Sequence, residues 1–467
     1  MLFSSIPFLY YFLPLVLALY FFVPKKGKNF VLLIASLFFY FYGEPVYVLL
    51  MIGACLSSYI HGLLIHRFRG RIWAKVFLWS SVITSLAMLG FFKYSDFFLE
   101  NLNAISGLDL PLLGLALPIG ISFYTFQTLS YTVDVYRGDA QVQKNFISLA
   151  TYVALFPQLI AGPIVRYTTV EEDLSRRTHS VEKFSAGISR FLMGLGKKVL
   201  IANQLGELCD IFRRSSDQSV LFFWLYAIGF SLHIYFDFSG YSDMAIGLGK
   251  LFGFRFLENF NYPFISKSIS EFWRRWHISL GSWFRDYVYI PLGGNRVSKG
   301  KWLRNILIVW LLTGFWHGAA WNFMVWGLFF GFFLVLEKFF LGAWLKKLPG
   351  FFAHLYVLFL VLISFVIFNA SSMGQAFSDI GGLFGSGGLP MVSREALYQL
   401  KSFGWILVLA LIGATPIPKL MVNRIKANGN GRKILNILEP VFLAGLLLVV
   451  TAYLVDGSFN PFLYFRF

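Results

Sequence analysis

Two apolar runs meet at one histidine in residues 306–335, which read ILIVWLLTGFWHGAAWNFMVWGLFFGFFLV. The histidine is His317, and Gly314 and Gly318 lie three residues before it and one after it. Apolar runs of this kind predict membrane-embedded helices. An imidazole between them is costly unless it is paired or faces water, so an ionisable group there indicates a functional site. Histidine titrates near neutral pH, which suits it to proton transfer.

The composition extends this membrane pattern over the whole chain. Of its 467 residues, 57% are hydrophobic and only 13% are charged, whereas a soluble protein carries about a quarter charged residues. Further apolar runs cover residues 7–23, 30–42, 46–65, 74–92, 221–236, 355–368, 406–417 and 440–455. We therefore predict an all-α, polytopic integral membrane protein with roughly 10–12 transmembrane or re-entrant helices. Residues 1–467 are expected to form a single membrane domain, without a separate soluble domain.

The N-terminal segment and the two cysteines give two further expectations. The first apolar run starts almost at Met1, without a basic segment before it or an obvious cleavage site after it, so we expect a retained anchor. Cys55 and Cys209 lie far apart and outside any partner motif, which indicates neither a disulfide framework nor a thiolate metal site.

The net charge of +17 is placed as in a membrane protein. Basic residues cluster beside apolar runs, first in residues 25–28 and then in residues 67–75. Two predicted spans separate these clusters, so both face the same side, which the positive-inside rule assigns to the cytoplasm. The N-terminus is then expected outside. The expected partner of this charge is the lipid bilayer and no nucleic acid.

Three segments interrupt the apolar pattern. Pro157 and Pro163 break residues 146–164, which predicts either a re-entrant element or a kinked span. The polar residues 166–183 that follow are expected to form a cytoplasmic loop or surface helix. Residues 260–301 alternate aromatic and cationic side chains, as segments at the membrane–water interface do. Residues 371–402, rich in Gly and Ser, are expected to form a loop with short helices.

The seven histidines divide by their surroundings. His277 and His317 are the strongest candidates, because each directly follows a tryptophan in an aromatic segment. The alternative for both is a core histidine that donates to a backbone carbonyl. For His233, the carboxylate of Asp237 at i+4 favours a structural hydrogen bond. The others are expected to be interfacial or solvated: His61, His66, His179 and His354.

Competing kinds of catalytic site lack their motifs. The sequence contains no HExxH-like set of metal ligands, no GxSxG elbow and no Gly-rich phosphate loop. Local chemistry therefore favours a lone general base over a metal centre or a covalent triad.

Several longer motifs resemble those of a known family. They are LPIGISFYTFQ at 117–127, DVYR at 134–137, FPQLIAGP at 156–163, DFSGYSD at 237–243, residues 272–296, residues 314–321 and NPFLYFRF at 460–467. Together these resemble the membrane-bound O-acyltransferases, and specifically their bacterial alginate O-acetyltransferase branch. The resemblance covers nearly the whole chain and is weakest over residues 371–435.

The resemblance implies a helical membrane fold with a cytoplasmic and an extracytoplasmic funnel, in the inner or plasma membrane of a bacterial cell. It places the signature histidine of the family at His317 and its second functional position at His277. It implies an acetyl donor that is a cytoplasmic thioester, acetyl-CoA, and no bound cofactor or metal. It further implies an extracytoplasmic polysaccharide acceptor and a partner of the SGNH-hydrolase-like type.

Our hypothesis from both lines of reasoning is that His317 acts as general base on an acceptor hydroxyl. His277 would orient the acceptor or stabilise the developing oxyanion. Arg274, Arg275 and Arg285 are candidates for binding the phosphates of CoA, with interfacial anchoring as the alternative for each. A last candidate is Tyr464, as a transient acyl carrier or, more simply, an aromatic anchor.

Other classes of function stay open at this point. A transporter would also have an intramembrane histidine and broken helices, but it should show inverted-repeat hydropathy. A scaffold of a polysaccharide secretion complex would not need His317. Within the enzyme hypothesis, the acceptor is alginate, peptidoglycan, another exopolysaccharide or a wall polymer.

Overall fold

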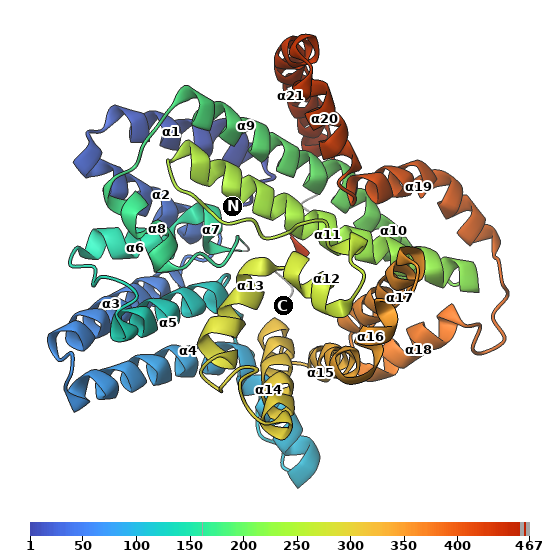
Figure 1. The fold of residues 1–467 in the computed structure, drawn as a ribbon, viewed down its shortest axis with the longest axis horizontal. Helices are drawn as coiled ribbons and strands as arrows, with labels where there is room; N and C mark the ends of the chain where they lie inside the picture. Colours follow the sequence, from blue (N-terminus) through green and yellow to red (C-terminus); the bar gives the residue numbers. More distant parts are fainter. Residues whose placement is uncertain (161, 458–461, 464–467) are drawn as a thin grey trace. The chain divides into compact units, whose positions relative to one another are not determined.

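The fold is known from a computed structural model that describes residues 1–160, 162–457 and 462–463 (Figure 1). Over these residues all regular structure is helical, which confirms the all-α prediction. Seven helical stretches among them are long and apolar enough to cross a membrane: Val48–Arg67, Ile72–Ser106, Val220–Leu251, Trp321–Leu345, Gly350–Asn369, Arg394–Gly413 and Gly429–Asp456. The sequence estimate also counted shorter apolar segments, such as Pro7–Phe22. The chain is a multi-pass membrane protein.

The described chain divides into two compact units. Unit 1 comprises Met1–Phe191 and Tyr241–Leu257, and unit 2 comprises Leu192–Gly240 and Glu258–Phe467. Helices α9 and α11 contribute residues to both units. The expectation of a single membrane domain stays a prediction.

Unit 1 is built from the N-terminal helices, with α3, α4 and α5 packed side by side (Figure 1). Its core is aromatic, with the rings of Phe3, Phe8, Phe39 and Phe156 in mutual contact. The elements in chain order are η1 Pro7–Phe12, α1 Leu13–Phe22, η2 Lys25–Gly27, α2 Lys28–Phe41, α3 Val48–Arg67, α4 Ile72–Ser106, α5 Ile121–Arg137, α6 Phe146–Ala154, α7 Phe156–Leu159, α8 Tyr167–Ser175 and the start of α9 Val181–Gly196.

The first predicted interruption is a real break in the helix. α6 ends at Ala154, and the single turn α7 begins at Phe156. The backbone groups near the break find partners: Gln158 Nε2 donates to the Tyr152 carbonyl at 2.6 Å, and the Phe156 amide donates to Ser36 Oγ at 3.0 Å. These residues are buried, as non-helical backbone at membrane depth has to be.

Unit 2 contains the long helices of the C-terminal half and the short helices of the second interruption. Residues 260–301 form several short helices, and residues 371–402 carry α18 and the start of α19, as the sequence predicts. The elements are η3 Lys197–Ala202, α10 Asn203–Arg214, α11 Val220–Leu251 as far as Gly240, η4 Pro263–Ile265, α12 Ile269–Arg275, α13 Ile278–Phe284, η5 Arg285–Tyr289, α14 Lys299–His317, α15 Trp321–Leu336, η6 Glu337–Leu341, α16 Gly342–Leu345, α17 Gly350–Asn369, α18 Met373–Leu383, α19 Arg394–Gly413, α20 Ile417–Ala427 and α21 Gly429–Asp456.

Glycines let α14 and α15 pack backbone against backbone. A Cβ atom on Gly314 would lie 2.3 Å from the Phe323 carbonyl oxygen, and one on Gly327 would lie 2.2 Å from the Trp310 carbonyl oxygen. A Cβ on Gly318 would meet the Phe323 ring at 2.2 Å. The two glycines that flank His317 therefore admit the neighbouring helix, and this contact determines where α14 ends.

A buried ion pair connects η3 to α11 within unit 2. Lys198 Nζ lies 2.6 Å from Asp237 Oδ1, and both side chains are almost completely buried. The other oxygen of Asp237 accepts from the Leu463 amide at 2.8 Å. The expected His233–Asp237 hydrogen bond is thus wrong, because Lys198 takes the carboxylate and His233 Nδ1 lies 2.6 Å from the Ala202 carbonyl instead.

Candidate active site

His277 lies between two seven-residue helices in an unusual backbone conformation. It follows α12 and precedes α13, and its φ of 45° is in the left-handed region. That region costs an ordinary residue about 1–2 kcal/mol, so the surrounding structure has to hold it. Two backbone hydrogen bonds do so: Ile278 N donates to the Asn259 carbonyl at 3.0 Å, and Asn261 N donates to the Arg275 carbonyl at 2.9 Å.

The side chain of Asn259 orients the His277 ring. Its Oδ1 accepts from the Ser279 amide at 3.1 Å and from the Ser279 hydroxyl at 2.9 Å. His277 Nδ1 lies 3.2 Å from the same oxygen. The Oδ1 atom of an asparagine carries no proton and can only accept hydrogen bonds. Nδ1 of a neutral His277 therefore carries the proton and donates it. Its Nε2 then carries the lone pair and can accept a hydrogen bond.

The protonation state of His277 follows from its burial. The residue is 1% exposed and lies outside the seven apolar helices, and burial lowers the pKa of its imidazole to about 3. The ring of Phe238 lies edge-on to it at 4.6 Å between centroids. His277 is therefore neutral at pH 7, with a lone pair on Nε2.

His317 is the last residue of α14 and sits among aromatic rings. Its ring centroid lies 5.0 Å from Trp316, 5.0 Å from Trp326 and 5.3 Å from Phe368, each in an edge-to-face arrangement. Asn322 Nδ2 donates to the Ala370 carbonyl at 2.9 Å, which ties the end of α17 to α15 and holds Phe368 in place. The imidazole is 5% exposed.

One indole connects the two histidines that the sequence singles out. The Trp316 ring lies 6.1 Å from His277 and 5.0 Å from His317, centroid to centroid. The structure thus brings His277 and His317, which are 40 positions apart in the sequence, into contact with one aromatic side chain. Such a pair places two imidazoles at one buried site, where His277 is neutral and can accept a hydrogen bond.

Two of the three predicted arginines line a large cavity of unit 2. The cavity has a volume of about 1210 Å³, and Arg274 and Arg275 are among its lining residues. Arg275 also pairs with Glu271 at 2.9 Å. The structure does not bring Arg285 to this cavity, because its guanidinium pairs with the adjacent Asp286 at 2.6 Å and is 61% exposed.

The same cavity holds further cations that sequence reasoning missed. Lys267, Lys338 and Lys346 also line it, together with the carboxylates of Glu271 and Glu337. Glu337 accepts from the Ser270 amide and hydroxyl, each at 3.0 Å, so its charge is already engaged. Little in the sequence indicates that these lysines share a cavity, since they come from segments far apart in the chain.

The other residues missed are those that hold the histidines. Asn259 orients His277, and Trp326 and Phe368 contact His317, but each lies in a segment without a chemical motif of its own. Tyr464, the candidate acyl carrier, lies outside the described residues. Over the residues that the structure describes, no group of three or more His, Cys, Asp or Glu side chains could hold a metal ion.

The fold is that of a polytopic, all-helical membrane protein. Residues 129–373 match the model of MBOAT, the membrane-bound O-acyltransferase family. The chain belongs to this family and is an O-acyltransferase. The family thus confirms the resemblance noted from the sequence motifs.

Similar proteins narrow the comparison to O-acetylation. The chain is 40% identical to the probable alginate O-acetylase AlgI of Pseudomonas putida, over the full length of both chains. It is 43% identical to the protein of the same name from Pseudomonas aeruginosa, over 83% of this chain and 75% of that one. It is also 34% identical to the peptidoglycan O-acetyltransferase of Helicobacter pylori, over 85% of this chain and 82% of that one. These relatives support a membrane O-acetyltransferase.

Proposed function

We propose that this membrane O-acetyltransferase takes acetyl groups from acetyl-CoA at the cytoplasmic face and passes them across the membrane to an extracytoplasmic, alginate-like polysaccharide. The observation that carries the proposal is the pair His277 and His317, which both contact the Trp316 ring. The relatives named as alginate O-acetylases, similar over the whole chain, support the choice of acceptor class. The membrane would be the inner or plasma membrane of a bacterial cell.

In the proposed reaction His317 is the general base. The acceptor hydroxyl oxygen attacks the thioester carbonyl carbon while its proton moves to His317. The carbon–sulfur bond then breaks, and the leaving thiolate of CoA takes the proton from His317, which returns to its neutral form. A positioned base of this kind contributes about 10²–10⁴-fold to the rate.

The geometry of His277 supports one of its two proposed roles over the other. A neutral ring with its proton on Nδ1 presents a lone pair on Nε2, so it accepts a hydrogen bond from an acceptor hydroxyl and orients it. Stabilising an oxyanion would need a proton on Nε2, which the buried ring lacks at neutral pH. His277 therefore orients the acceptor in this mechanism.

The cavity lined by Arg274 and Arg275 is the proposed site for the CoA phosphates. Five cationic side chains line it, namely Lys267, Arg274, Arg275, Lys338 and Lys346, and guanidinium and ammonium groups pair well with phosphate. Ile306 at the cavity and His317 lie on the same helix, about 16 Å apart along its axis. A pantetheine arm is a chain that can bridge such a separation.

The proposed partner is an SGNH-hydrolase-like protein on the outer face, which would complete transfer to the polysaccharide. A second candidate acceptor is peptidoglycan, favoured by the relative named as a peptidoglycan O-acetyltransferase, which is similar over most of both chains. A transporter or a scaffold of a secretion complex would need no acyl-transfer chemistry, and the family membership weighs against both.

The test measures acetyl transfer by the purified protein through the release of free CoA. Wild type and His317→Ala are compared, and equal unfolding temperatures show that both are folded. We expect the variant to lose at least a hundredfold in rate. In parallel, mass spectrometry of surface glycans from cells with and without the gene would identify the acceptor. Retention of most of the rate in His317→Ala would refute the general-base role, and unchanged acetylation of every glycan would refute the proposed function.

A further inference from the structure

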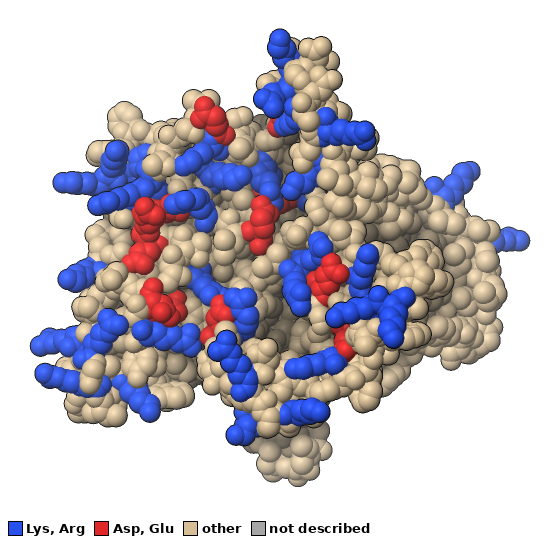
Figure 2. All heavy atoms as spheres, in the orientation of Figure 1, with Lys and Arg blue, Asp and Glu red and all other residues tan. Residues whose placement is uncertain are grey.

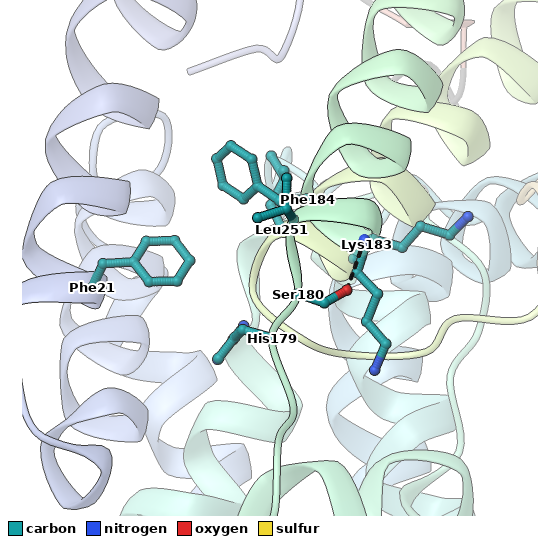
Figure 3. Close-up of a pocket in the computed structure, with 8 residues that line it drawn as sticks. Phe21, His179, Ser180, Lys183, Phe184 and Leu251 are labelled. Atoms are coloured by element: carbon teal, nitrogen blue, oxygen red, sulfur yellow. Dashed lines mark hydrogen bonds between the residues drawn. The ribbon is translucent and has the colours of Figure 1, made fainter. Parts of the chain in front are cut away.

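Unit 1 has a small surface pocket that combines basic and aromatic side chains, and its lining includes neither His277 nor His317. It has a volume of about 340 Å³. Figure 3 shows Phe21, on α1, facing Phe184, Leu251 and His179 across it. We call it the basic pocket; its lining residues are Phe21, His179, Ser180, Val181, Lys183, Phe184, Lys250 and Leu251.

Neighbouring residues hold the side chain of His179 in the basic pocket. Tyr20 donates to the Phe252 carbonyl at 2.7 Å, and the same hydroxyl lies 3.2 Å from His179 Nε2. Gly253 has a φ of +84°, and a Cβ atom there would lie 2.8 Å from the imidazole. The wall of the pocket thus depends on a glycine and a buried tyrosine that make room for this ring.

Positive charge concentrates around the basic pocket. Lys183 and Lys250 line it, and Lys28 Nζ lies 3.4 Å from His179 Nε2. Burial, and then the charges of Lys28, Arg177 and Lys183, lower the pKa of His179. Among the residues that the structure describes, no carboxylate lies within ion-pair distance of Lys28, Lys183 or Lys250. Over the face that Figure 2 draws, Lys and Arg outnumber Asp and Glu, although α8 itself carries Glu171, Glu172 and Asp173.

The rim of the basic pocket is apolar and exposed. Phe21 is 45% exposed and Val181 is 82% exposed. Aromatic and aliphatic side chains next to lysines are typical of a membrane–water interface. The contact of Lys28 with His179 also joins residues 25–28, which the positive-inside rule assigns to the cytoplasmic side, to residues 166–183, which are expected to form a cytoplasmic loop or surface helix.

We propose that the basic pocket binds the phosphate headgroup of an anionic phospholipid of the cytoplasmic leaflet, with an acyl chain lying along Phe21 and Val181. Basic pockets among membrane helices on this side recognise such headgroups, and each lysine near the surface contributes to the attraction. The apolar rim favours a lipid over a free phosphate, because a free anion gains nothing from Phe21 or Val181. The site is separate from the proposed catalytic residues.

The experiment uses the full-length protein in a neutral detergent and measures binding by native mass spectrometry and by the rise in unfolding temperature. The probes are phosphatidylglycerol, phosphatidylcholine and inorganic phosphate. We expect phosphatidylglycerol alone to bind well and to stabilise the wild type. The double substitution Lys183→Gln with Lys250→Gln should weaken this binding roughly ten- to thirtyfold.

Two further variants test whether phosphatidylglycerol binding depends on the apolar rim and on cations outside the pocket. Phe21→Ser should weaken phosphatidylglycerol binding severalfold, since it removes an apolar contact of the acyl chain. The matched control is Arg67→Gln with Arg71→Gln, which removes two exposed cations of the same predicted side outside the pocket and should leave the affinity unchanged. The proposal is overturned if the control weakens binding as much as the pocket variant, if inorganic phosphate stabilises the protein equally, or if the pocket variant binds phosphatidylglycerol like wild type.

Discussion

Both units of this chain place a histidine among aromatic rings, but the other neighbours of these histidines differ: they are uncharged in unit 2 and cationic in unit 1. In unit 2, His277 and His317 are buried, and an amide, indoles and phenyl rings surround them. In unit 1, His179 is exposed beside Lys28, Lys183 and Arg177. Burial keeps the His277 imidazole neutral in the first environment, whereas the second concentrates positive charge around His179. Burial and neighbouring charge therefore determine what each histidine can do.

The largest expected difference between the two sites is in the rate of acetyl transfer. His317→Gln should lower kcat about 10²–10⁴-fold, because glutamine cannot take the proton of the acceptor hydroxyl. His179→Gln should leave kcat unchanged. Steady-state release of CoA from acetyl-CoA by both purified variants measures the difference. Equal losses in the two variants would remove the functional distinction between the sites.

The next effect concerns stability and uses a buried and an exposed ion pair. Asp237→Asn should lower the free energy of unfolding by about 3–5 kcal/mol, because it leaves the buried charge of Lys198 without its carboxylate. The matched change in unit 1 is Glu172→Gln, which removes a carboxylate 3.7 Å from Arg255 with both side chains about three-quarters exposed. It should cost less than about 1 kcal/mol. Denaturant unfolding in detergent measures both, and similar costs would contradict the burial argument.

A third prediction is the pH dependence of stability. Burial lowers the pKa of His277 to about 3 in the folded protein, while its unfolded value is about 6.5. Below pH 6.5 the unfolded chain takes up a proton that the folded ring does not, so the free energy of unfolding falls as the pH falls. At pH 5 this loss is about 2 kcal/mol. Unfolding measured from about pH 7.5 to about pH 5 should show this loss in the wild type, because this range contains the pKa of histidine in the unfolded chain.

The control variants locate that loss. His277→Gln should remove most of the pH dependence, since the titrating ring is gone. His179→Gln should retain most of it, because the buried ring of His277 is still present in that variant. A wild-type stability that does not change over this interval would mean that His277 is not held neutral by burial.

The smallest expected effect belongs to the residue that orients His277. Asn259→Ala removes the oxygen on which His277 Nδ1 and Ser279 converge. We expect kcat to fall about five- to thirtyfold, the cost of one or two buried hydrogen bonds. Asn259→Asp restores an acceptor and, by placing a negative charge beside the ring, should raise the pKa of His277 and shift the pH–rate profile upward. An unshifted profile in that variant would argue that Asn259 is only structural.

The class of fold and one catalytic candidate could be read from the sequence because both depend on local composition. Apolar runs predict membrane helices whatever their neighbours are, and His317 stands out because it interrupts such a run. The breaks near Pro157 and within residues 260–301 were predictable for the same reason, since proline and alternating charge act within a few residues.

Other parts of the candidate site depend on contacts between distant segments. Asn259 has no signal in the sequence, because its value comes from the left-handed turn at His277, 18 residues later. Arg285 resembles Arg274 in the sequence, but its carboxylate neighbour Asp286 and its exposure separate it from the cavity. Asp237 was assigned to His233 by helical spacing, and the buried Lys198 takes it instead.

The sequence by itself determined that this chain is a helical membrane protein with an ionisable group at an apolar helix junction, because hydrophobic length and composition act locally. Its long motifs also pointed to the O-acyltransferase family. Only the tertiary structure decided which groups meet: the two histidines at Trp316, the cations of the cavity lined by Arg274 and Arg275, and the basic pocket around His179. The physical reason is that burial, charge neighbours and hydrogen-bond partners come from residues that are distant in sequence, and these set the pKa and the chemistry of each site.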